Sequence, residues 1–148
     1  MTRASLPRTL STAEVERGAM LPELRIEASP TFVVSTAIAT RDFQDVHHDR
    51  DAAVTRGSKD IFVNILTTTG LVQRFVTDWA GPQALVRGVA LRLGAPWYAY
   101  DTLTLSGHVA ERVEQDGETR FVVAVVGRNG LGDHVTATVR IALPERAS

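Results

Sequence analysis

The chain has 148 residues, with 16 Lys and Arg against 17 Asp and Glu, and it has no cysteine. A net charge of -1 offers no basic field for a nucleic acid or an anionic membrane, and the lack of cysteine excludes disulfides and thiolate metal ligands. The length suits one domain, and with no signal peptide pattern and no apolar run long enough to span a bilayer, we expect a cytoplasmic protein.

The first twenty residues are polar and show no sustained period. We therefore expect residues 1–20 to form an N-terminal extension outside the core, and residues 21–148 to form the domain. The next segment, 31–38, is rich in β-branched residues, which predicts a half-buried strand. Its apolar side chains share one face at Phe32, Val34 and Ile38.

Residues 59–79 predict a buried central helix. Their apolar side chains recur at intervals of three, four and seven, at Ile61, Ile65, Val72, Phe75 or Val76, and Trp79. The segment is too long for one strand, so this period outweighs the intrinsic β preference of its Val, Ile and Thr residues. The small side chains of residues 67–70 predict a surface that a sheet can approach closely.

The second half of the chain alternates with a period of two, which predicts strands with one buried face. The alternating residues are Leu85, Val89, Leu91 and Leu93, then Leu103, Leu105, Val109 and Val113, and then Val135, Ala137, Val139, Ile141 and Leu143. Residues 121–126 are apolar on both faces, as in a central strand. The turn pairs Asp116-Gly117 and Asn129-Gly130 connect the last three strands as a meander.

Together these elements predict an α+β fold in which one antiparallel sheet wraps around a long central helix. One sheet with one helix leaves an edge and a face uncovered, so we expect a dimer.

The stretch ATRDFQDVHHDRDAA, residues 39–53, holds four aspartates and two adjacent histidines, which allow three interpretations. A metal site is disfavoured because the remaining histidines, His108 and His134, fall on strand positions opposite the apolar face, where we expect them to be solvated. The acids just ahead of Ala52 also suit a helix N-terminus. The third interpretation is an acid/base pair.

Asp42 and His47 are five residues apart, and a turn between them would bring both side chains to one pocket. Such a pair suits the addition of water to a carbon-carbon double bond, with Asp as the base and His delivering the proton. The enolate that forms needs a donor, and the N-terminus of the central helix supplies free N–H groups. The spacing alone does not choose between this interpretation and a helix cap.

The residues around this pair resemble the MaoC-like enoyl-CoA hydratases, which have a hotdog fold. That family carries Asp-x-Asn-Pro-x-His followed six positions later by Ala or Ser, and here Asp42, His47 and Ala53 stand at those places. The strand opening Asp101-Thr102-Leu103 and the last hairpin, with Asn129 and Gly132, are also similar. The resemblance covers about residues 24–143 and implies that Asp42 and His47 are catalytic.

Two departures from the family pattern affect the site. Gln44-Asp45 replaces Asn-Pro, and Asn64-Ile65 replaces the His-Gly pair that supplies an oxyanion N–H in many members. A backbone N–H survives a change of side chain, so the resemblance implies Ile65 as the donor, with Asn64 beside it at the substrate. It implies no cofactor and no metal.

Longer runs, including TRDFQDVHHDRD and GSKDIFVNILT, resemble one branch of the family, the small catalytic subunits of heteromeric steroid enoyl-CoA hydratases in bacterial cholesterol degradation. This implies a steroid acyl-CoA substrate with a three-carbon side chain, a larger MaoC-like partner with an appended second domain, and a thiolase-like aldolase bound through that partner. A non-catalytic acyl-CoA-binding subunit and a hotdog thioesterase stay as alternatives. The aromatic run Trp97, Tyr98 and Tyr100 suits either a steroid pocket or interface packing.

Overall fold

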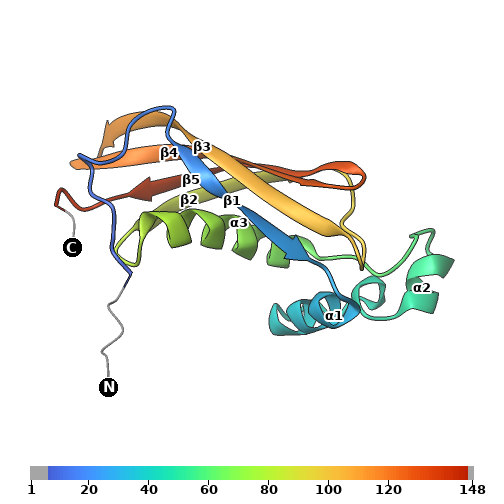
Figure 1. Ribbon diagram of the computed structural model, residues 1–148. Helices are drawn as coiled ribbons and strands as arrows, with labels where there is room; N and C mark the ends of the chain where they lie inside the picture. Colours follow the sequence, from blue (N-terminus) through green and yellow to red (C-terminus); the bar gives the residue numbers. More distant parts are fainter. Residues whose placement is uncertain (1–6, 147–148) are drawn as a thin grey trace, which may run out of the picture.

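The computed structural model describes residues 7–146, in which a sheet carries one long helix along one of its faces (Figure 1). Three shorter helical segments lie at the end of the sheet where the long helix begins (Figure 1). In chain order the elements are β1 (Met20–Glu27), α1 (Pro30–Ala39), the 3-10 turn η1 (Asp45–His47), α2 (Arg50–Thr55), α3 (Ile65–Ala80), β2 (Leu85–Leu93), β3 (Thr102–Gln115), β4 (Glu118–Asn129) and β5 (Gly132–Ala142).

The sheet has the order β1-β3-β4-β5-β2, and every neighbouring pair is antiparallel. The predicted α+β fold and the meander of the last three strands are therefore confirmed. The strand predicted as central, β4, occupies the middle of the sheet. The hairpin at Asp116-Gly117 connects β3 and β4 as predicted, and the turn between β4 and β5 is at Gly130-Leu131, one residue after the predicted Asn129-Gly130.

The core lies between α3 and the inner faces of β3, β4 and β5. Val72, Phe75 and Val76 of α3 are almost fully buried against the alternating apolar side chains of these strands. The close approach depends on Gly107 of β3, where a Cβ atom would lie 3.1 Å from Phe75 Cε1. Of the small residues predicted to let the sheet approach, Thr68 is fully buried and bonds to His134 of β5, whereas a Cβ at Gly70 would meet nothing within 4 Å.

The strand predicted over residues 31–38 is wrong, because this segment forms helix α1. Ser29 Oγ accepts the N–H of Phe32 at 3.1 Å, and Pro30 occupies the first turn, so the local N-cap overrides the β-branched composition. Val33 and Ala37, which are four residues apart, form the buried side of this helix. The first strand is instead β1, which pairs with β3 at the edge of the sheet.

The central helix begins at Ile65, six residues later than we predicted. Asn64 caps it, because its Oδ1 accepts the N–H of Thr67 at 3.1 Å. The preceding residues run extended, with the N–H of Val63 bonded to Trp97 O at 2.9 Å. This extended segment lines a cavity that also borders the start of α3.

Strand β2 matches its predicted buried face only in part: Val89 and Leu91 are half-buried against the core, whereas the two ends of the strand are exposed. Leu85 is 52% exposed and Leu93 is 37% exposed, although both share the predicted apolar face. The strand lies at the sheet edge, where it still contacts α3, and its pairing with β5 is irregular between Val86 and Gly88. An uncovered apolar edge strand is an available site for a partner.

The segment 7–19, which we had expected outside the core, packs across the end of the sheet. Val15 is 3% exposed, and the N–H of Leu10 bonds to Ala80 O at 2.8 Å, at the end of α3. Residues 1–6 of the predicted extension lie outside the described residues. Within residues 7–146, no helix is long and apolar enough to cross a membrane.

Candidate active site

Asp42 owes its position to the way α1 ends. The N–H of Asp42 bonds to Ala37 O at 2.9 Å, and the N–H of Arg41 bonds to Ile38 O at 3.0 Å. This pair of backbone hydrogen bonds is a Schellman C-cap, which requires the residue before Asp42 to adopt the left-handed conformation. Arg41 does so with φ 58°, and the chain therefore turns Asp42 back toward the core.

Glycine at position 41 is expected to stabilise this turn. A non-glycine residue in the left-handed region costs about 1 kcal/mol, partly offset because glycine is more flexible in the unfolded chain. We expect Arg41→Gly to raise the Tm of the purified protein by about 2 °C. Arg41→Val, with a β-branched side chain, should lower the Tm, and a stabilising effect of Val would contradict this account of the cap.

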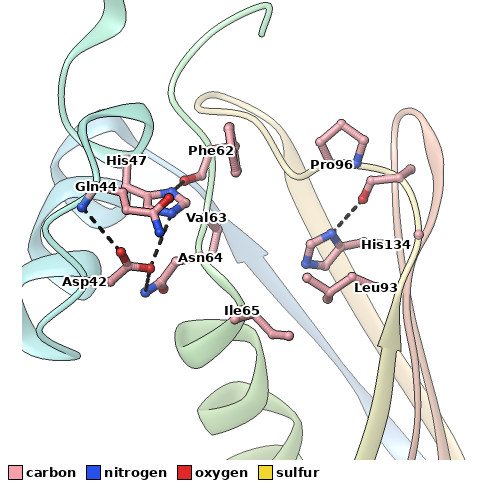
Figure 2. Close-up of a pocket in the computed structure, with 12 residues that line it drawn as sticks. Asp42, Gln44, His47, Phe62, Val63, Asn64, Ile65, Leu93, Pro96 and His134 are labelled. Carbon is pink, nitrogen blue, oxygen red and sulfur yellow. Dashed lines mark hydrogen bonds and ion pairs between the residues drawn. The ribbon is translucent and has the colours of Figure 1, made fainter. Parts of the chain in front are cut away.

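His47 lies at the end of η1 and is 5% exposed. Its Nδ1 is 2.7 Å from Phe62 O, and its ring packs edge-on against the Phe62 ring, with centroids 4.8 Å apart. Because a carbonyl only accepts, Nδ1 carries a proton and Nε2 faces Asp42. The Nε2–Oδ2 distance is 3.3 Å, so the residues predicted as a pair lie together (Figure 2).

Asn64 connects this pair to the central helix. While Oδ1 caps α3, Nδ2 donates to Asp42 Oδ2 at 3.0 Å and to Thr40 Oγ1 at 2.9 Å. The hydrogen bond from Asn64 lowers the pKa of Asp42 most strongly; burial opposes it, and the N–H of Gln44 and the charge of His47 act in the same direction as Asn64. The carboxyl group of Asp42 is therefore kept ionised, as a base must be.

Ile65 is the first residue of α3 and lines the same cavity as Asp42 and His47. The N–H groups of Ile65 and Leu66 have no acceptor among residues 7–146, as is usual in the first turn of a helix. Ile65 is 49% exposed. The predicted oxyanion donor is thus free and stands beside the acid/base pair, although its role stays a prediction.

Replacing Asn64 with aspartate separates its two roles. Aspartate caps a helix as well as asparagine does, so α3 should keep its N-cap. The new carboxylate removes the donor to Asp42 and adds a like charge, which should raise the pKa of Asp42. The prediction that Asp42 is a catalytic base, which is active only when ionised, therefore requires the acid limb of the pH profile of kcat/KM to move to higher pH. Asn64→Ser, a neutral cap, should give an intermediate position, and an unmoved limb in Asn64→Asp would contradict the assignment.

The cavity has a volume of about 440 Å³ and lies between two walls (Figure 2). Asp42 and His47 form one wall, and residues at the end of β2 and in β5 form the other. The prediction that His134 is solvated is wrong, because this residue lines the second wall and is 2% exposed. His134 points inward because the pairing of β4 and β5 is irregular here. It is an extra residue between Asp133 and Val135, which are both paired with β4, and this breaks the alternation of the strand.

The remaining acids of the stretch 39–53 and the aromatic run 97–100 do not line this cavity. Asp49 caps α2 through the N–H of Ala52 at 3.0 Å, and Asp51 lies in its first turn, so the helix-cap interpretation holds for these two residues. Among residues 7–146, no group of three or more His, Asp or Glu side chains could hold a metal ion. Trp97 is buried in the core, whereas Tyr98 and Tyr100 line a second cavity of about 340 Å³.

Comparison with known proteins identifies one strong relative. No family model matches the chain. The chain is 68% identical over 126 residues to the 3-oxo-4,17-pregnadiene-20-carboxyl-CoA hydratase beta subunit of Mycobacterium tuberculosis, which covers 85% of this chain and 95% of the relative. It is also 67% identical to a chain in the crystal structure of the ChsH1-ChsH2 complex from Mycobacterium tuberculosis, with a TM-score of 0.81 over 86% of this chain and 98% of that one.

More distant structures share the fold alone. The R-hydratase PhaJ1 of Pseudomonas aeruginosa is 23% identical, with a TM-score of 0.81 over 95% of this chain and 90% of that one. The MaoC-like dehydratase of Rhodospirillum rubrum is 17% identical, with a TM-score of 0.77 over 93% of this chain and 98% of that one.

Proposed function

Since the chain belongs to the MaoC-like hotdog enoyl-CoA hydratases as a hydratase subunit, we propose that it is the catalytic subunit of a heteromeric steroid enoyl-CoA hydratase. The observation that carries this proposal is the contact of 3.3 Å between Asp42 Oδ2 and His47 Nε2, which faces a cavity at the start of α3. A base, a proton donor and a free backbone N–H thus border one space.

In the proposed reaction, a water molecule in the cavity, next to both side chains, attacks the β-carbon of the enoyl thioester. Asp42 accepts a proton from the water as the C–O bond forms, and the electron pair of the double bond moves onto the α-carbon and the thioester oxygen. The N–H of Ile65 stabilises that oxygen, and the helix dipole of α3 adds to the effect. Protonated His47 then donates the proton from Nε2 to the α-carbon.

The direct contact between the two side chains restores the site for the next turnover. After the addition, Asp42 holds one proton and His47 lacks one, so a transfer across the 3.3 Å contact returns both to their starting states. The Nδ1–H bond to Phe62 O keeps the imidazole in the required orientation throughout.

The substrate we propose is a steroid enoyl-CoA with a three-carbon side chain, by analogy with the substrate in the name of the 68% identical relative. Hydration of a double bond between a ring carbon and that side chain places the hydroxyl on a carbon with three other carbon neighbours. Such an alcohol cannot be oxidised to a ketone, so the consuming reaction must break a carbon-carbon bond. A retro-aldol cleavage by a thiolase-like aldolase meets this requirement.

We propose that a larger MaoC-like subunit with an appended second domain completes the acyl-CoA site. Support comes from the related chain in the ChsH1-ChsH2 complex and from β2, whose apolar edge is uncovered. Leu93 at the end of β2 also lines the cavity, so a partner on this side would reach the site.

The test is to co-express the chain with candidate partner subunits and to incubate the purified complex with a steroid enoyl-CoA. Hydration predicts a product heavier by one water and no release of free CoA. Release of CoA would instead identify a thioesterase, and a complex that does neither would identify a binding subunit. A homodimer that is fully active alone would contradict the proposed partner.

A further inference from the structure

His134 is a buried histidine to which the proposed chemistry gives no task. It lies in β5, across the cavity from Asp42 and His47 (Figure 2). Its ring packs against that of Trp97, with centroids 5.8 Å apart and an interplanar angle of 62°. Burying an imidazole is unfavourable unless its ring nitrogens find partners, so the contacts that it makes indicate its role.

Both ring nitrogens of His134 are bonded within the protein. Nδ1 is 2.7 Å from Ala95 O, and Nε2 is 2.9 Å from Thr68 Oγ1. Because the carbonyl of Ala95 only accepts, Nδ1 carries the proton. Burial lowers the pKa of His134 and the bond to Ala95 opposes this, so the ring is neutral and Nε2 accepts the hydroxyl proton of Thr68. The imidazole therefore bridges two segments and has no nitrogen left for substrate.

The two segments that it bridges both border the cavity. Thr68 is in the first turn of α3, and its N–H bonds to Asn64 O at 3.2 Å, so it moves with Asn64 and Ile65. Ala95 belongs to the segment 94–96, which follows β2 and lines the cavity. A Cβ atom at Gly94 would lie 2.4 Å from Asp133 O, which shows how closely this wall packs against β5.

The first turn of α3 is thus tied on both sides. On one side Asn64 binds Asp42, with Nδ2 and Oδ2 3.0 Å apart, and on the other Thr68 binds His134. We propose that His134 is a positioning residue of the hydratase, which fixes the first turn of α3 against the wall at Ala95 and so holds the Ile65 N–H opposite Asp42 and His47. This inference rests on the proposed function.

The test uses the assembled complex and the steroid enoyl-CoA of the hydration assay. Thr68→Val keeps the shape of the side chain and removes the hydroxyl, whereas His134→Leu removes the imidazole. Since the oxyanion donor acts mainly in the transition state, each change should lower kcat by about 10- to 100-fold and leave KM within about threefold. Thr68→Ser, which restores the hydroxyl, should keep kcat within about threefold of the unmodified complex. The matched control His108→Leu, at an exposed position on β3, should leave kcat unchanged.

The double variant His134→Leu/Thr68→Val should be no slower than His134→Leu alone, because both changes remove the same hydrogen bond, the one between Thr68 and His134. Losses that multiply, or assembled Thr68→Val and His134→Leu complexes with kcat within about twofold of the unmodified complex, would overturn the proposal. A loss confined to Tm, to assembly or to KM would also overturn it. If His134→Leu does not assemble, the kcat values of Thr68→Val and Thr68→Ser test the proposal instead: the first should be lowered and the second should not. A lack of hydration by the unmodified complex would instead contradict the proposed function.

Discussion

Replacing Asp42 with asparagine is expected to lower kcat/KM for hydration by about 1,000-fold, within the range found when a general base is removed. Asparagine has nearly the same shape, and its amide oxygen can take the place of Asp42 Oδ2, which accepts a hydrogen bond from Asn64 Nδ2 at 3.0 Å. It cannot take the proton of the attacking water. The rate of formation of the hydrated product by the assembled complex measures this loss.

The matched control for this change is Asp51→Asn, in the same polar stretch. Asp51 is exposed in the first turn of α2 and does not line the cavity. We expect this complex to hydrate at the unmodified rate. If Asp42→Asn keeps kcat/KM within a few-fold of the unmodified complex, Asp42 is not the base.

Replacing His47 with asparagine should have the second largest effect, a loss of about 100-fold or more in kcat. An asparagine amide can replace the Nδ1–H bond to Phe62 O, which is 2.7 Å long in the structure, so the segment before α3 should keep its position. The proton carried on Nε2 is lost, and nothing then protonates the α-carbon. The neighbouring variant His48→Asn is the control, because His48 is exposed.

A useful secondary readout is the exchange of the α-proton of the product with solvent deuterium. With His47→Asn this exchange should slow in parallel with hydration, because the same group delivers and removes that proton. Exchange at the unmodified rate, with hydration lost, would assign proton delivery to another residue.

The sequence predicted the later strands well because their order is encoded locally. Leu103, Leu105 and Val109 alternate on one strand and are all buried, and the turns between β3, β4 and β5 use residues that favour hairpins. Segment 31–38 failed because Phe32, Val34 and Ile38 gave a strand period, while Ser29 and Pro30 cap a helix just before it. A cap that involves only two residues is easily missed beside a strong composition signal.

At the site, the proximity of Asp42 and His47 could be predicted from the sequence because it depends on local structure. Asp42 directly follows the C-cap of α1, and His47 is the last residue of the 3-10 turn η1, so two short local structures bend the chain within a few residues. The sequence could not reveal that Asn64 bonds to Asp42, because those residues are 22 positions apart. Nor could it place His134, whose inward orientation depends on an irregularity in strand pairing.

The most direct test of the account is the rate of hydrated product formation by the double variant Asp42→Asn/His47→Asn in the assembled complex. If the two side chains act as one unit across their 3.3 Å contact, the double variant should be about as slow as Asp42→Asn alone. If the losses of the single variants multiply, or if the double variant hydrates the steroid enoyl-CoA at nearly the unmodified rate, the central claim is wrong.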